Sequence, residues 1–116
     1  MERTSFKMEY SNITMVKGNT VSFNIEVMDG NGDPMMMDSA SFACKKDPAG
    51  LITIFEKTLG NGIVQDEDGL ITVRIAPEDT AETDAGRYYY EFRLGTGDDV
   101  FTILIGIFDI EQNVAE

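Results

Sequence analysis

The stretch that decides the fold is DAGRYYYEF, residues 84–92. In an extended chain, Tyr88, Tyr90 and Phe92 fall on one side, and Tyr89 falls on the other. This period of two is typical of a strand with one face in the core and one toward water. The Asp-x-Gly sequence in front of it favours a turn. The stretch therefore predicts a turn that leads into a half-buried strand.

The same period recurs along most of the chain. Further strands are predicted at residues 20–29, 40–46, 51–58, 69–77 and 99–110, with another within 5–16. Helix signals are confined to 77–82, where Pro77 and two acids favour a short turn before Gly86. About seven to eight short strands separated by turn residues predict an all-β protein, an antiparallel β-sandwich, with residues 1–116 forming a single domain.

The turn and strand also match a local motif. Asp84, Gly86 and Tyr88 resemble the D-x-G-x-Y pattern that precedes the penultimate strand of immunoglobulin-like domains. The resemblance implies an immunoglobulin-like sandwich in which the Tyr88 hydroxyl bonds back to upstream backbone. Tyr90 stands where antibody-type domains carry their second cysteine. We expect an aromatic ring to fill that core position in place of a disulfide.

Composition excludes several classes of function. The chain has 21 acidic and 9 basic residues, a formal charge of −12 and no histidine. Such a surface repels phosphate, so neither nucleic acid nor an anionic membrane is an expected partner. Cys44 is the single cysteine and alternates with Phe42, which predicts a core residue and no intrachain disulfide. The N-terminal sequence shows no signal peptide, so synthesis in a cytoplasm is expected.

No motif for catalysis or for a cofactor stands out. Without histidine the common general bases and triads are missing, and there is no phosphate loop or zinc cluster. The chain is therefore predicted not to be an enzyme and to hold no metal or cofactor.

The best metal candidate is DGNGDPMMMDSA, residues 29–40, which places Asp29, Asn31 and Asp33 like the first ligands of a calcium loop. Pro34 and Ala40 then break that pattern, which favours a polar hairpin turn. The acidic run 66–68 is likewise interpreted as a solvated loop.

The candidate interface comes from two apolar features. The last strand is apolar on both faces, and one of its rows is Phe101, Ile103, Ile105 and Ile107. Either a bulge at Gly106 turns this row, or a neighbouring subunit covers it. The other feature is the run Met35, Met36 and Met37. The run either contributes to a contact surface or crosses the end of the sandwich and buries two of its methionines.

The order of segments also resembles a family over nearly the whole chain. Five segments follow one another as in the N-terminal β-sandwich domain of phage baseplate upper proteins and related tail or fibre proteins: VKGNTVSFNIEVMDGNGDPMMM, SASFACKKDPAG, DGLITVRIAPEDTAE, DAGRYYYEFRL and FTILIGIFDIEQNV. The resemblance implies a non-enzymatic virion structural protein made in a bacterial host. It also implies partners among other virion proteins or further copies of the chain, and a fibre or receptor-binding region commonly follows such domains.

A second hypothesis about function also fits the sequence. The chain is alternatively a carbohydrate- or surface-binding adhesion module whose acidic turns hold calcium. Glycan-binding domains stack sugars on exposed aromatic rings, and Tyr89 is the candidate for that role.

Overall fold

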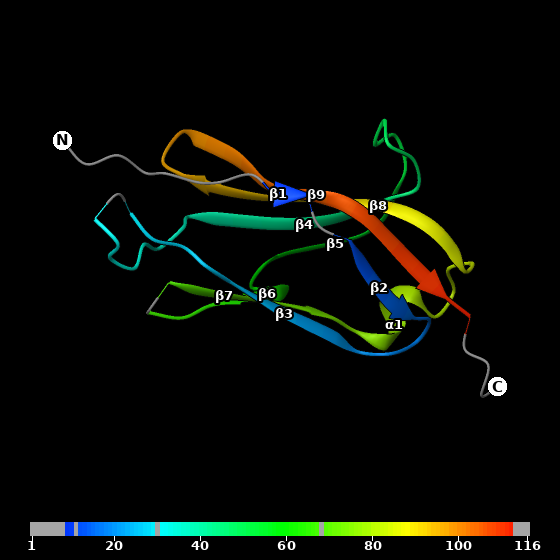
Figure 1. Ribbon diagram of the computed structural model, residues 1–116. Helices are drawn as coiled ribbons and strands as arrows, with labels where there is room; N and C mark the ends of the chain where they lie inside the picture. Colours follow the sequence, from blue (N-terminus) through cyan, green and yellow to red (C-terminus); the bar gives the residue numbers. More distant parts are fainter. Residues whose placement is uncertain (1–8, 11, 30, 68, 113–116) are drawn as a thin grey trace.

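A computed structural model describes residues 9–10, 12–29, 31–67 and 69–112 (Figure 1). Its elements in chain order are β1 (Glu9–Tyr10), β2 (Ile13–Val16), β3 (Val21–Glu26), β4 (Ser39–Lys45), β5 (Thr53–Leu59), β6 (Gly62–Gln65), β7 (Leu70–Ile75), α1 (Pro77–Thr80), β8 (Gly86–Thr96) and β9 (Asp99–Glu111). The predicted strands and the predicted helical turn are present. Of the strand expected within 5–16, residues 5–8 and 11 lie outside the described residues.

The fold is all-β and sandwich-like, as predicted. The strand order is β1-β9-β8-β4-β5-β6-β7-β3, and β2 pairs with β9. Figure 1 shows β9, β8 and β4 in one layer and β7, β6 and β3 in the other. Strands β4, β8 and β9 pair as antiparallel neighbours, and so do β3, β7 and β6. This pairing is the one expected for an immunoglobulin-like sandwich.

Three strand pairs depart from the antiparallel expectation. Strands β1 and β2 run parallel to β9, and β5 runs parallel to β6. The β5–β6 pair arises because the chain turns sharply between Thr58 and Gly62, which lie opposite each other. Gly60 and Gly62 have φ of 88° and 92°, a region that glycine enters at little cost. This turn carries the chain from one layer to the other.

The core is organised around one phenylalanine. Phe42 on β4 is fully buried, and its ring lies 5.2 Å from that of Tyr90 and 5.3 Å from that of Phe23. The rings of Phe55 and Phe108 follow at 6.2 Å each. Tyr90 is buried and stacked on Phe42, which confirms that an aromatic ring fills the position of the missing cysteine.

The turn before β8 has the predicted geometry. The Tyr88 hydroxyl donates a hydrogen bond to the Asp84 carbonyl oxygen at 2.6 Å. The Tyr88 ring itself is buried. Burial, together with the nearby Asp84 carboxylate, raises the pKa of the Tyr88 hydroxyl. The resemblance of this stretch to the immunoglobulin corner therefore extends to its hydrogen bond.

Helix α1 is held by contacts outside itself. Its four residues cannot form a stable isolated helix. The Asp79 carboxylate accepts a hydrogen bond from the Ala76 N–H at 2.7 Å. It also forms an ion pair with Lys57, whose Nζ lies 2.6 Å from Asp79 Oδ2. The buried Thr80 hydroxyl accepts a hydrogen bond from the Gly18 N–H at 2.9 Å. These contacts fix the helix between β5 and the segment before β3.

Candidate protein–protein interface

The outer surfaces of the two layers differ in character. On the layer of β3, β7 and β6, the outward residues include Ser22, Asn24 and Arg74, all of them exposed. Asn24 accepts a hydrogen bond from the Thr72 hydroxyl at 2.9 Å. This is a solvated polar surface. On the other layer, the outward side of β8 and β9 carries an aromatic ring and two isoleucines.

A β-bulge separates the predicted row on β9. Phe92 lies opposite Leu104, but Arg93 lies opposite Thr102, so Ile103 is the extra residue. Phe101 and Ile103 both pack on the core, and Ile103 is only 6% exposed. Beyond the bulge, the row turns to the outer side. The bulge that was one of the two alternatives is therefore present, at Ile103 instead of Gly106.

Ile105 and Ile107 lie on the outer side, where a partner could reach them. Ile107 is paired with Tyr89, and both are partly exposed. Ile105 is paired with Glu91. Tyr89 was predicted on the outward side of its strand, and it lies there in the structure. Of the four residues in the predicted row, only these two isoleucines lie on the outer surface.

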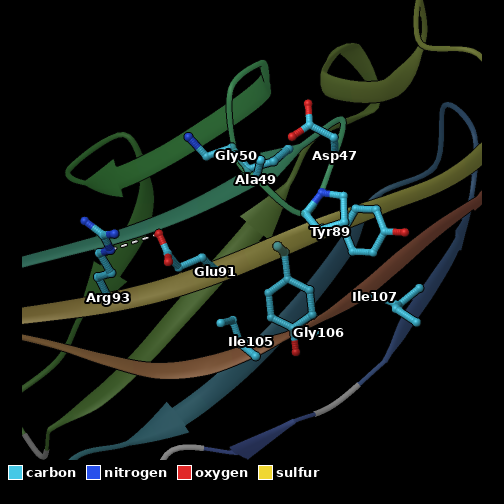
Figure 2. Close-up of a pocket in the computed structure, with 12 residues that line it drawn as sticks. Asp47, Ala49, Gly50, Tyr89, Glu91, Arg93, Ile105, Gly106 and Ile107 are labelled. Atoms are coloured by element: carbon cyan, nitrogen blue, oxygen red, sulfur yellow. Dashed lines mark ion pairs between the residues drawn. The ribbon is translucent and has the colours of Figure 1, made fainter.

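A hollow of about 410 Å³ lies over these residues. The loop between β4 and β5 forms one wall with Pro48, Ala49 and Gly50. Figure 2 shows Ala49 and Gly50 of this loop facing the strands that carry Tyr89, Ile105 and Ile107. The charged side chains that line the hollow are those of Lys45, Asp47, Glu91 and Arg93.

Two ion pairs lie on the outer side of β8 and β9. Arg93 Nε lies 2.9 Å from Glu91 Oε1, and Figure 2 marks this ion pair. Arg87 Nε lies 3.0 Å from Asp109 Oδ1, and hydrogen bonding to Asp109 raises the pKa of the Arg87 guanidinium. On a chain of charge −12, these pairs leave the outer side of β8 and β9 close to neutral. Two such surfaces can approach with little repulsion.

The loop that walls the hollow continues into two exposed apolar side chains. Leu51 is 83% exposed and Ile52 is 52% exposed. Exposed apolar side chains beside a partly apolar hollow are typical of contact surfaces. We call the surface formed by Tyr89, Ile105 and Ile107 with Pro48 and Ala49 of this loop the Tyr89 face. Sequence analysis missed the part of it that the β4–β5 loop contributes, because no local pattern shows onto which strands a loop folds.

The three methionines lie elsewhere. Met37 is buried and Met35 is partly buried against the core, whereas Met36 is 51% exposed. The Met37 N–H donates to Gln65 Oε1 at 2.6 Å, and Gln65 Nε2 donates to the Met37 carbonyl oxygen at 3.0 Å. This segment therefore has Met37 in the core, Met35 partly buried and Met36 exposed, which is closer to the second of the two alternatives.

The acidic turns use their carboxylates within the fold. Asp29 Oδ1 accepts hydrogen bonds from the N–H groups of Asn31 and Asp33, at 2.8 and 3.1 Å. Asp66 Oδ1 accepts one from the Leu70 N–H at 3.0 Å, while Asp68 lies outside the described residues. Over the described ranges, no group of three or more histidine, cysteine or acidic residues is arranged to hold a metal ion.

Cys44 is buried among core residues on β4. Burial raises the pKa of its thiol to about 12, so the thiol stays protonated at neutral pH. No helix within the part of the chain that the structure describes is both long and apolar enough to cross a membrane.

Comparison with known proteins identifies no family. No protein-family model and no curated protein matches the chain. Among solved structures, the chain is similar to extracellular domains 3–5 of Drosophila OTK, with 13% identity and a TM-score of 0.33. The alignment covers 97% of this chain and 35% of that one, so this chain spans about a third of its length. A likeness at this TM-score bears on neither the fold nor the function.

Proposed function

We propose that this protein is a non-enzymatic structural component of a phage or prophage virion, in the baseplate or tail, and that it acts through protein–protein assembly. The observation that supports assembly is the Tyr89 face, where partly exposed apolar residues border a hollow of about 410 Å³. The assignment to a virion rests on the order of segments along the chain. The protein would be made in the host cytoplasm and incorporated there into the particle.

Substitution of Ile105 tests the assembly role. Ile105→Asp places an unpaired carboxylate on the Tyr89 face, and a charge at the centre of a contact surface opposes binding. Val64→Asp is the control, because Val64 is an apolar residue on β6 in the other layer and is 67% exposed. We expect Ile105→Asp to abolish incorporation into particles, while Val64→Asp is incorporated normally and both variants melt as cooperatively as the wild type.

The virion assignment has its own measurement. Particles purified from the source strain after prophage induction are labelled with an antibody against this chain and viewed by electron microscopy. Labelling at the tail tip or baseplate is the expected result. Particles that contain no trace of the chain by mass spectrometry would contradict the virion assignment and leave the Tyr89 face as a contact surface of another kind.

The adhesion alternative is supported by one observation. The Tyr89 ring lines a hollow that also contains Lys45 and Asp47, which offers a sugar both a stacking surface and hydrogen-bonding groups. A ligand that binds only the native state raises the melting temperature, and the shift grows with the logarithm of ligand concentration above the Kd. Glycan and calcium titrations followed by thermal melting should then show a shift that Tyr89→Ala removes. No shift with any glycan would contradict this alternative.

A further inference from the structure

Strand β3 forms an open end of the sheet. All six of its residues pair with β7, from Val21 opposite Ile75 to Glu26 opposite Leu70. Among the described residues, no strand lies against its second edge, and Figure 1 shows β3 at the margin of its layer. The backbone N–H and C=O groups along that edge are therefore open to another strand. The opposite end of the sheet is covered differently, because β1 and β2 both pair with β9.

This edge lacks the features that usually block strand addition. Proteins protect edge strands with proline, lysine, bulges or very short strands. The sequence of β3, VSFNIE, contains neither proline nor lysine, and its register with β7 is unbroken. The other partly open strand, β5, has a register irregularity opposite Lys45 and carries Lys57. Strand β3 is thus the edge best suited to pairing.

The core is also incompletely covered at this edge. Val21, Phe23 and Ile25 pack on the core but remain partly exposed. Their partners on the next strand are Ile75, Val73 and Ile71, each with no exposed surface. A further strand beside β3 would cover the apolar row that β7 cannot reach. Burial of that apolar surface favours the addition of a strand.

We propose that β3 pairs in antiparallel fashion with β3 of a second copy of this chain, across a two-fold axis. Phe23 then lies opposite Phe23 of the partner subunit, and Ser22 lies opposite the partner's Asn24. Val21 lies opposite the partner's Ile25, so apolar residues meet apolar residues. An isologous contact of this kind closes after two copies and joins the two sheets into one.

Charge identifies a second copy as the occupant. Residues 18–25 carry no charge in a chain whose net charge is −12, so this segment approaches its own copy with little repulsion. The segment is bordered by Lys17 at one end and Glu26 at the other. Antiparallel pairing brings the Lys17 end of one strand alongside the Glu26 end of its partner. Parallel pairing would place like charges together.

This inference is independent of the proposed function, because the Tyr89 face belongs to the other layer of the sandwich. The proposed function can therefore be wrong while β3 pairs as proposed. Equally, β3 can remain unpaired while the proposed function is right. If both hold, one subunit contacts its copy through β3 and another protein through the Tyr89 face.

The test introduces like charges opposite each other across the proposed two-fold axis. The double variant Ser22→Lys with Asn24→Lys places lysine opposite lysine at two positions, and the double variant Ser22→Glu with Asn24→Glu places glutamate opposite glutamate. Sedimentation equilibrium of the wild type should show a dimer that tightens with added salt. Each double variant should weaken the dimer at least about tenfold, and a mixture of the two should restore it. Val64→Lys, on β6, which is separated from β3 by β7, is the control and should dimerise as the wild type does.

Cross-linking tests the register. A mixture of the Ser22→Cys and Asn24→Cys proteins should form a disulfide-linked heterodimer on mild oxidation, because opposite residues of antiparallel strands lie within disulfide reach. Each variant alone should cross-link poorly, and buried Cys44 should not compete. A wild type that stays monomeric at high micromolar concentration overturns the proposal. A dimer that Ile105→Asp disrupts and the lysine double variant does not also overturns it, and assigns self-association to the Tyr89 face.

Discussion

At the scale of single residues, Tyr88 contributes through one directed bond. Its hydroxyl bonds to the Asp84 carbonyl oxygen four residues upstream, while its ring is buried against the core. Tyr88→Phe keeps the ring and removes the bond, so we expect a loss of about 1 kcal/mol in the free energy of unfolding. Urea denaturation measures this change in the free energy of unfolding. Tyr89→Phe, at a partly exposed ring, is the control and should change stability far less; equal losses in the two variants would contradict the role of the bond.

Cys44 makes stability depend on alkaline pH. Burial raises the pKa of its thiol from 9.0 to about 12, so the folded state holds the proton more tightly than the unfolded state. The stabilisation that results is complete below pH 9 and is lost as the pH rises toward 12. Tyr88 shifts in the same direction but titrates from a higher ordinary value.

The expected result is a urea midpoint that falls between about pH 8 and about pH 9.5, and that falls less steeply in Cys44→Ala. The comparison concerns slopes, because Cys44→Ala also leaves a small cavity that lowers stability at every pH. Equal slopes in the two proteins would show that the thiol does not cause the pH dependence.

At the scale of elements, α1 depends on the ion pair between Lys57 and Asp79. Their side chains are only 13% and 12% exposed, so loss of one partner leaves the other poorly solvated. Asp79→Asn should lower the free energy of unfolding by about 2 kcal/mol, since breaking a largely buried pair is costly. The double variant Lys57→Met with Asp79→Asn should recover part of this loss. A double variant less stable than the sum of the single changes would contradict that explanation.

Elements defined by local patterns could be predicted, and those defined by pairing could not. The turn and strand from Asp84 to Phe92 were recognisable because the motif and the alternation lie within a few residues. The orientation of Ile103 depends on which residue of β8 it faces, and the bulge opposite Phe92 and Arg93 has no marker within β9 itself. The parallel pairing of β1 and β2 with β9 joins residues 95 positions apart, such as Glu9 with Leu104, so no local periodicity reveals it.

In the candidate site, too, the features set by local sequence were predictable and those set by tertiary contacts were not. The outward position of Tyr89 was predictable from alternation alone. The hollow beside it also requires the fold of the β4–β5 loop, and the neutrality of the surface requires the pairing of Arg87 with Asp109 across two strands. The backbone of buried Met37 is held by Gln65, a residue on a different strand. Each of these contacts depends on the tertiary structure.

At the scale of the whole molecule, charge opposes folding as well as association. A net charge of −12 on 116 residues means that compaction brings many carboxylates closer together. Salt screens this repulsion over a distance of about 10 Å at 0.1 M ionic strength. We therefore expect the melting temperature to rise from low to moderate sodium chloride concentration. Sodium chloride is the suitable salt, because sulfate would also stabilise through exclusion from the protein surface.

A variant with fewer charges separates self-repulsion from other effects of salt. Glu67, Glu82 and Asp98 are exposed. Glu67→Gln, Glu82→Gln and Asp98→Asn together change the net charge from −12 to −9, since each removes one negative charge. This triple variant should melt at a higher temperature than the wild type at low salt and should gain less from added salt. Both proteins retain the Tyr89 face and β3 and could therefore self-associate. Melting is measured at low protein concentration, so that association does not contribute to the difference in melting temperature. A triple variant whose melting temperature rises with salt as steeply as that of the wild type would show that self-repulsion is not the source of the salt dependence.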